Sequence, residues 1–209
     1  MIQEFDPYLL KSNLIGNGLS VPNKGLVLEA RAETSFDQLD DFTKLRAQTI
    51  NQIMDFLIMI RSINPHNLEG AVLDFGMGIG PGAYVLQQYG GYVTGVDSAF
   101  YSVQRTIDQG ILPIGKAYFK DGFEYLRSLQ PDSLNLIAAF KMHKRFPHKR
   151  LYLESRRVLK PKGQLLITGE LVELKEELQR TVGKYGKVEN LVTNGDTTLK
   201  EVAFIYTKR

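Results

Sequence analysis

The 209-residue chain contains no cysteine. Disulfides, thiolate zinc sites, iron–sulfur clusters and cysteine nucleophiles are therefore excluded, and no metal site is predicted. Long apolar runs are also missing: none is longer than Phe56–Ile60, far short of a membrane span. The first ten residues lack the basic-then-apolar pattern of a signal peptide. These absences predict a cytoplasmic protein with no membrane partner.

Positive charge is concentrated in one segment of the chain. The formal net charge is only +3, yet residues 141–162 carry nine Lys and Arg and a single acid. The remaining residues carry 17 basic and 22 acidic side chains. We therefore expect a local basic surface, whose position decides its meaning, and not a generally basic protein.

From Ser35 the chain shows regular periodic patterns. A capping box, "SFDQ", precedes apolar residues that recur at helical spacing from Leu39 to Ile60, including Phe42. Strand and helix patterns then alternate as far as Val182. The predicted strands of this part are 71–75, 92–96, 111–114, 134–139 and 164–168. Two further strands, 187–192 and 201–207, flank a "TNGD" turn and predict a hairpin.

This alternation predicts an α/β fold with a doubly wound, mainly parallel seven-stranded sheet. Helices would cover both faces, and the hairpin would add antiparallel pairing near one edge. Residues 36–209 are expected to form this domain, and residues 1–35 an extension that caps the active site. Ligands bind such sheets at the carboxyl ends of the strands, where the winding direction reverses. The glycine-rich loop after the first strand is predicted to lie there.

That loop reads Asp74-Phe-Gly-Met-Gly-Ile-Gly80, with glycine at every second position. Glycine allows the backbone to approach a ligand closely and to adopt positive φ. A dinucleotide site requires Gly-x-Gly-x-x-Gly, and the carboxylate of Asp74 would repel a pyrophosphate. Asp97 ends the next predicted strand, where an acid accepts two ribose hydroxyls. A ligand with a ribose, a cationic amine and no phosphate is S-adenosylmethionine.

At this point the chain resembles a known family, the class I S-adenosylmethionine-dependent methyltransferases. "VLDFGMGIG" is similar to their first motif and "VTGVD" to their second. The stretch from Asp132 to Thr168, ending in "VLKPKGQLLIT", resembles their fourth strand, the following loop and helix, and the turn into the fifth strand. The terminal hairpin resembles their reversed last strand. The resemblance extends over residues 36–209.

The resemblance implies a role for each residue near the cofactor. Asp74 and the loop glycines would hold the methionine part, Asp97 the ribose hydroxyls, and the segment after the third strand the adenine. The implied cofactor-binding residues are Asp74, Gly76, Met77, Gly78, Gly80, Asp97, Ser98, Asp121, Gly122, Phe123 and Phe140. Two positions depart from the family pattern. Lys116 stands near the usual acid of the third strand, and Asn135 replaces an acid at the start of the fourth.

The methyl acceptor is expected beside the loop after the fourth strand, residues 140–150. His143 is the candidate general base there, because an imidazole titrates near neutral pH. Five cations of this loop are either an anion-attracting pocket mouth, a nucleic-acid contact or solvated surface. They are Lys141, Lys144, Arg145, Lys149 and Arg150.

Some acceptors are disfavoured by what the sequence lacks. Methylation at pyrimidine C5 requires a cysteine, and the "DPPY" or "NPPY" motif of exocyclic-amine methyltransferases is absent. These points favour methyl transfer to a small, anionic acceptor. Two alternatives stay open: a methyltransferase that acts on RNA or another macromolecule through the basic loop, and a protein that binds S-adenosylmethionine without catalysis.

Overall fold

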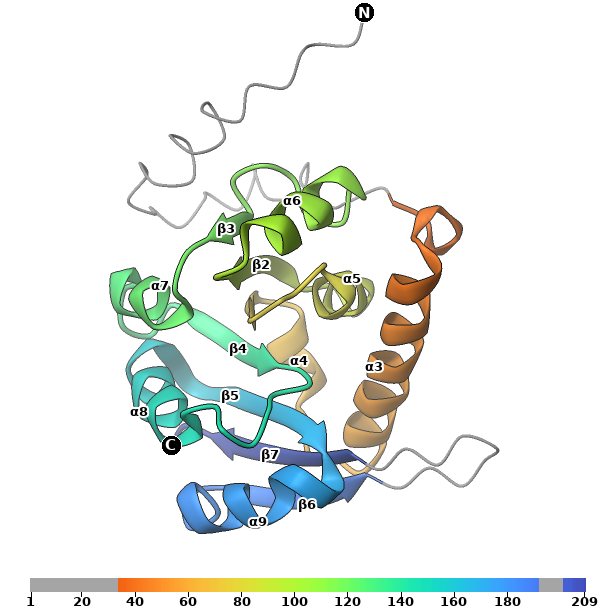
Figure 1. The fold of residues 1–209 in the computed structure, drawn as a ribbon. Coiled ribbons are helices and arrows are strands. Elements are labelled where there is room, and N and C mark those ends of the chain that lie inside the picture. The colour runs from red at the N-terminus through yellow and green to blue at the C-terminus, as the bar shows by residue number, and fades with distance from the viewer. Residues whose placement is uncertain (1–33, 192–200) are drawn as a thin grey trace, which may run out of the picture.

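The computed structural model describes residues 34–191 and 201–209. The predicted N-terminal extension lies almost wholly outside these residues, as does the turn of the C-terminal hairpin. Within the described residues, seven strands form one sheet in the order β3-β2-β1-β4-β5-β7-β6 (Figure 1). The strands are β1 Ala71–Phe75, β2 Tyr92–Asp97, β3 Ala117–Phe119, β4 Leu134–Ala139, β5 Leu159–Glu170, β6 Lys187–Leu191 and β7 Glu201–Thr207.

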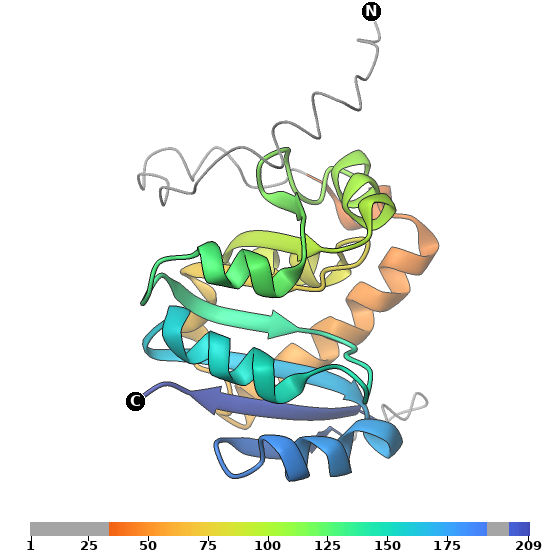
Figure 2. The ribbon, with the colours of Figure 1, turned by 60° about the vertical axis from the view of Figure 1, so that its left-hand side comes forward.

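Helices connect the strands of this sheet. They are the 3₁₀ turn η2 Phe36–Gln38, then α3 Asp41–Met59, α4 Pro65–Leu68, α5 Pro81–Gln88, α6 Phe100–Asp108, α7 Gly122–Ser128, α8 His148–Val158 and α9 Leu171–Thr181. Strands β1 to β5 pair in parallel, whereas β7 pairs antiparallel with both β5 and β6. Figure 2 shows β7 pointing opposite to β4 and β5. The predicted fold class, strand number and hairpin are confirmed.

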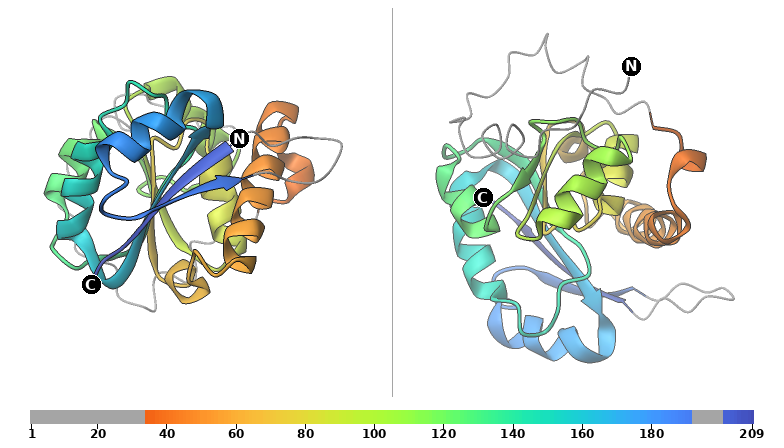
Figure 3. Two further views of the ribbon diagram at one scale, coloured as in Figure 1. Left: turned by 90° about the horizontal axis from the view of Figure 1, so that it is seen from below. Right: turned by 45° about the horizontal axis from the view of Figure 1, so that its top comes forward.

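The sheet is buried on both faces, which explains its continuous apolar strands. Side chains alternate between the faces, so Val72 joins the core beneath α3 and α5 while Leu73 joins the core beneath α7, α8 and α9. Figure 3 (left) shows α3 and α8 on opposite sides of the sheet. From β1 the chain winds outward to β3 and then returns to β4, on the other side of β1. The glycine-rich loop therefore leaves the sheet at its switch point.

The third strand differs from the prediction. Residues 111–114 were expected to form it, but Ile111 and Leu112 are buried as loop residues and β3 begins at Ala117. Pro113, which has no N–H for a sheet ladder, lies within the predicted segment. Lys116 thus precedes the strand, and Asp121, two residues after it, is the first acid that follows.

The first long helix also begins later than predicted. Ser35 and Gln38 do form the capping interaction, with the Ser35 N–H donating to Gln38 Oε1 at 2.9 Å. That cap closes only the short turn η2, however, and the chain becomes extended at Leu39. Asp40 then caps α3 by accepting the Thr43 N–H at 2.8 Å. Two successive N-caps replace the single predicted one.

Candidate active site

A cavity of about 280 Å³ lies at the switch point of the sheet. Three parts of the chain line it: the glycine loop with the first turn of α5, the first half of α3, and the segment that follows β4. The lining residues are Phe42, Arg46, Ile50, Asp74, Gly76, Met77, Gly78, Ile79, Pro81, Gly82, Phe140, Lys141 and Met142. The topology thus brings the predicted cofactor loop and the predicted acceptor loop to one cavity.

The loop glycines are required by backbone conformation. Gly76, Gly78 and Gly80 have φ values of +68°, +55° and +93°, a region that L side chains rarely adopt. A Cβ added at Gly78 would meet no atom within 4 Å, so the space beside it is open. At Gly82, by contrast, a Cβ would lie 2.7 Å from Asp74 Oδ2 and 2.6 Å from the Phe140 ring. The loop is therefore shaped to expose backbone and to admit the Asp74 carboxyl group.

Asp74 is a buried acid on the cavity wall. It is only 1 % exposed, and burial raises its pKa from 3.8 to about 7; the backbone N–H of Ala83 opposes the shift, and the charge of Asp97 adds to it. Its Oδ2 atom has no hydrogen-bond partner among the described residues. A buried carboxylate oxygen without a partner costs several kcal/mol, on the order of 1–3 for the missing bond alone, which a ligand cation can offset.

Asp97 connects the end of β2 to the glycine loop. Its Oδ2 accepts the Gly78 N–H at 2.9 Å, and its Oδ1 accepts the Ala99 N–H at 2.8 Å. Each carboxylate oxygen can accept a second hydrogen bond. The side chain is thereby oriented at the carboxyl end of β2, with acceptor capacity left on both oxygens.

Helix α3 contributes cavity residues that the sequence analysis did not select. Phe42, Arg46 and Ile50 are spaced by four residues and occupy one face of the helix. Phe42 belongs to the apolar pattern of the predicted helix, but it is 56 % exposed, and the guanidinium of Arg46 lies 5.2 Å from its ring centroid. The regular spacing was visible in the sequence. Nothing local indicated which cavity this face would meet.

Two of the proposed cofactor residues have different surroundings from the glycines. The Met77 side chain is buried beneath β2, where a Cβ on Gly95 would lie 2.1 Å from its sulfur. Its N–H donates to the Val96 carbonyl at 3.1 Å, so Met77 can offer the cavity little more than backbone. Ser98, which follows Asp97, is exposed.

The predicted adenine segment forms the start of α7. Asp121 caps this helix, because its Oδ1 accepts the N–H groups of Phe123 at 3.0 Å and Glu124 at 2.9 Å. The Phe123 amide is thus already bonded, and its ring packs edge-on against Phe75 at 5.4 Å. A Cβ at Gly122 would collide with the Phe75 ring at 2.5 Å, which explains that glycine. Phe140, in contrast, lines the cavity directly.

The segment after β4 holds the predicted catalytic loop. His143 is exposed and does not belong to the lining of the cavity. Its Nδ1 accepts the N–H of Arg145 at 3.2 Å, so a neutral ring carries its proton on Nε2. The carbonyl of His143 also accepts the Phe146 N–H at 2.9 Å. In this conformation the imidazole closes the loop on itself.

The five loop cations do not act as one group. Lys141 pairs with Glu201, which is buried on β7, and the guanidinium of Arg150 lies 4.0 Å from the centroid of the Phe123 ring. Lys144, Arg145 and Lys149 are exposed. Within the described residues, no three His, Asp or Glu side chains gather in a way that could hold a metal ion. Nor is any helix of this part long and apolar enough to cross a membrane.

A family model described as a methyltransferase domain matches residues 73–167, from within β1 into β5. A search of curated proteins finds no significant match. Among solved structures, the PH0226 protein of Pyrococcus horikoshii OT3 is 16 % identical with a TM-score of 0.59, covering 83 % of this chain and 94 % of that one. The magnesium protoporphyrin IX methyltransferase of Synechocystis PCC 6803, solved with bound S-adenosylmethionine, is 15 % identical with a TM-score of 0.56, covering 91 % and 99 %.

Residues 73–167 are thus similar to a methyltransferase domain, and many of the structural neighbours are S-adenosylmethionine-dependent class I methyltransferases. A structure from Archaeoglobus fulgidus, named as a methyltransferase of this kind, has the same fold at 15 % identity, with a TM-score of 0.57 and coverage of 78 % and 94 %. At such low identities the solved structures establish the fold, and the family model identifies the segment that carries the glycine loop.

Asn135, a departure from the pattern of the family that the chain resembles, has a structural role. It lies at the amino end of β4, away from the cavity, where its Oδ1 accepts the Ala71 N–H at 3.2 Å and the Lys160 ammonium at 2.9 Å. A Cβ on Gly70 would lie 2.3 Å from the Asn135 side chain. The amide at this position therefore supports the amino end of β4 and does not line the cavity.

Proposed function

We propose that the protein transfers the methyl group of S-adenosylmethionine to a small acceptor that carries an anionic group. The cofactor supplies an electrophilic methyl group on a sulfonium, so the protein's task is to bind and orient both partners. The observation that carries the proposal is the unpartnered Oδ2 of buried Asp74 in a cavity that Arg46 also lines. A carboxylate and a guanidinium that line one cavity complement the ammonium and carboxylate groups of an amino acid.

At the methionine end we assign the ammonium to Asp74 and the carboxylate to Arg46. Arg46 is half-buried on α3 and held over Phe42, so less side-chain freedom is lost when it binds. A planar guanidinium also matches a carboxylate with two parallel hydrogen bonds. Arg46 was not among the residues selected from the sequence.

We assign the ribose hydroxyls to Asp97 and the adenine amino group to Asp121. Both backbone hydrogen bonds to Asp97 orient it and still leave an acceptor position on each oxygen. Both capping bonds of Asp121 fall on Oδ1, which leaves Oδ2 for the adenine. Asp121 is the first acid after β3, whereas Lys116 precedes that strand. This position supports Asp121 as the residue that contacts the adenine.

For the acceptor, the nearest surfaces are Phe42 on α3 and Phe140 and Met142 after β4. They favour an apolar body, and the exposed side chains of Lys144 and Arg145 would attract its anionic group. Lys141 is excluded from that task by its pairing with Glu201. Because Lys141 and Arg150 are both engaged within the molecule, the basic loop gives less support to an RNA acceptor than the charge count suggested.

Calorimetric titration with S-adenosylhomocysteine tests the cofactor assignments. Arg46→Gln should weaken binding about 10- to 100-fold, the range for a lost charge-assisted pair, whereas Lys44→Gln on the same helix removes equal charge outside the cavity and should leave affinity unchanged. Absence of binding to the wild-type protein would refute the proposed function. An equal loss of affinity in both variants would reject only the assignment of Arg46 and not the proposed function.

Methyl transfer itself is tested with labelled S-adenosylmethionine and a panel of small carboxylates and phosphates, run in parallel with RNA. We expect turnover of a small anion, with an apparent KM that rises with added salt and in the double variant Lys144→Ala, Arg145→Ala. Preferential labelling of RNA would favour the macromolecular alternative. Cofactor binding without any turnover would favour the non-catalytic one.

A further inference from the structure

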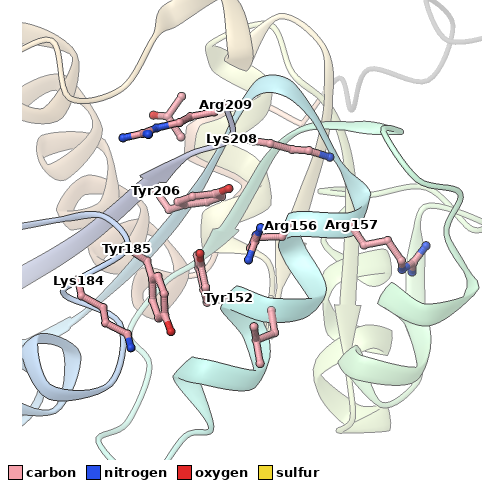
Figure 4. Close-up of a pocket in the computed structure, with 10 residues that line it drawn as sticks. Tyr152, Arg156, Arg157, Lys184, Tyr185, Tyr206, Lys208 and Arg209 are labelled. Atoms are coloured by element: carbon pink, nitrogen blue, oxygen red, sulfur yellow. The ribbon is translucent and has the colours of Figure 1, made fainter.

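A second, larger cavity lies near the amino-terminal ends of the parallel strands, at the opposite end of the sheet from the glycine loop. Its volume is about 740 Å³, and α8, the turn after α9 and the end of β7 enclose it (Figure 4). Because β7 runs antiparallel to β5, its last residues lie beside Gln164, near the amino ends of the parallel strands. We call it the basic cavity; none of its lining residues lines the candidate active site.

The described side chains that line the basic cavity include five cations and no acid: Arg156, Arg157, Lys184, Lys208 and Arg209. Two of them have structural partners. The Arg157 guanidinium donates to the carbonyls of Leu126 and Leu129, and Lys208 pairs with Asp132 at 2.6 Å. Arg156, Lys184 and Arg209 are exposed and lie on α8, in the turn after α9 and just after β7. Such a cluster of like charges around one concavity creates a positive potential that favours an anion.

Three tyrosines line the basic cavity, and two of its cations lie over their rings. Tyr152 stacks on Tyr185 with ring centroids 4.4 Å apart and meets Tyr206 edge-on at 5.0 Å. Arg156 lies 5.9 Å from the ring centroid of Tyr152, and Lys184 lies 4.8 Å from that of Tyr185. With these ring faces covered by side chains, the groups left for a ligand are hydroxyl and cationic donors.

The donors converge on one space. In Figure 4 the hydroxyl ends of Tyr152 and Tyr206 and the guanidinium of Arg156 point toward the same region of the cavity. Burial raises the pKa of Tyr152, which keeps its hydroxyl protonated and able to donate. A fork of two guanidinium donors and two hydroxyls already matches the about four acceptor positions of one carboxylate, and the cationic groups of Lys184 and Arg209 add further donors. This set of donors suits a tetrahedral group with several acceptor oxygens.

We propose that the basic cavity is a second binding site, which takes the phosphoryl group of a small phosphorylated ligand. Arg156 and the hydroxyls of Tyr152 and Tyr206 contact the phosphoryl oxygens, and Lys184 and Arg209 supply further positive charge at the rim. The same chemistry occurs in a nucleic-acid backbone. A small ligand is favoured because the cations surround a concavity instead of following an extended stripe.

Calorimetric titration of the full chain with inorganic pyrophosphate tests this site. Wild-type protein should bind pyrophosphate, and Arg156→Gln should weaken binding about tenfold or more. Tyr206→Phe keeps the ring and removes only the hydroxyl, so it should weaken binding severalfold at an unchanged melting temperature. Lys44→Gln on α3, which removes one positive charge far from the cavity, is the matched control and should bind like the wild type.

Other outcomes would overturn the proposal. No binding at millimolar pyrophosphate, or equal weakening in Arg156→Gln and Lys44→Gln, would leave an ordinary charged surface. Displacement of pyrophosphate by S-adenosylhomocysteine would show that pyrophosphate binds at the glycine loop and not in the basic cavity. Binding of single-stranded RNA that needs Arg156, without pyrophosphate binding, would make the surface a nucleic-acid contact. Since the assay requires no methyl transfer, its result is independent of the proposed function.

Discussion

Replacing Asp74 with asparagine should stabilise the ligand-free protein and abolish cofactor binding. The acid is buried, and one of its oxygens has no partner among the described residues. Asparagine has nearly the same shape, and its side-chain carbonyl can still accept the Ala83 N–H that the carboxylate accepts now. The substitution therefore removes a buried charge and little else.

The size of this effect follows from the pKa of Asp74, which burial raises from 3.8 to about 7. At 1.36 kcal/mol for each unit, a shift of this size corresponds to roughly 4 kcal/mol against the ionised native state above pH 7. The asparagine NH₂ would stand where Oδ2 now has no partner, and a buried donor without a partner costs about 1–3 kcal/mol. The net gain is about 1–3 kcal/mol, or an increase in melting temperature of roughly 2–10 °C.

The pH dependence of this gain has a definite sign. Between pH 4 and 7 the native protein keeps on Asp74 a proton that the unfolded chain has already released. The contribution of Asp74 to stability is thus most favourable below pH 4 and falls as pH rises to 7. Asp74→Asn should be about 1–3 kcal/mol less stable than the wild type near pH 4, where only the cost of its NH₂ group counts, and should overtake the wild type as the pH rises to about 8.

Denaturant titrations of both proteins at pH 4.5, 6 and 8 measure the difference. A variant that is less stable than the wild type at pH 8, or a gain that is the same at every pH, would refute the argument. Cofactor binding supplies a second check, because the ammonium requires ionised Asp74. The wild-type dissociation constant for S-adenosylhomocysteine should rise about tenfold for each pH unit below 7.

Three further predictions concern other residues. Gly78→Val should abolish cofactor binding in calorimetry because a β-branched residue resists φ +55°. The control is Gly115→Val, at φ +86° in open space outside the cavity, which should lower stability by a similar amount and leave cofactor binding unchanged. Burial lowers the pKa of His148 to about 4, so the contribution of His148 to stability should fall by up to about 3 kcal/mol as pH drops from 6.5 to 4, a loss that the opposite titration of Asp74 offsets in the wild-type protein. In denaturant titrations, His148→Leu, made in the Asp74→Asn background, should lack that loss. His143→Gln should lower kcat less than tenfold, since Nδ1 is already bonded within the loop; a 100-fold loss at unchanged cofactor affinity would support the predicted base.

The sequence predicted the conformation and position of the glycine loop well because its features are local. Positive φ at alternate positions requires glycine, whatever the rest of the fold does. An acid that ends a parallel strand must lie at the carboxyl edge of the sheet, so Asp97 could be placed from its position alone. Strand and helix periodicity then gave the winding that brings these two features together.

The third strand could not be placed because burial alone does not distinguish a strand from a loop. The run from Ile111 to Ile114 is apolar, but its first two residues fill the core as loop while Ile114 is 56 % exposed. The strand itself, Ala117–Phe119, is short and follows a lysine. Short apolar segments of this kind are decided by tertiary packing.

The partners of the charged residues were also invisible in the sequence. Lys141 and Glu201 are 60 positions apart, and only the pairing of β5 with β7 brings them together. Arg46 belongs to a helix whose local pattern predicts burial, and the cavity that it lines arises from the way α3 packs beside α5. Counting charge in the segment 141–162 likewise could not show that Arg156 and Arg157 line a cavity together with Lys184, Lys208 and Arg209.

The unfavourable position of Asp74 is itself an argument for a cationic ligand. Gly82 lacks the Cβ that would strike both the carboxyl oxygen and the Phe140 ring, so the chain keeps room for an acid that destabilises it. A bound ammonium would lower the pKa of Asp74 and recover the stability that burial of the charge costs. At pH 8 the ligand-free protein bears the full cost of the ionised Asp74. Binding of a cationic ligand should therefore raise stability more at this pH than binding of a neutral ligand with the same other contacts. An analogue that lacks the amino group keeps the ribose and adenine contacts. It should stabilise the wild-type protein without this additional gain at pH 8.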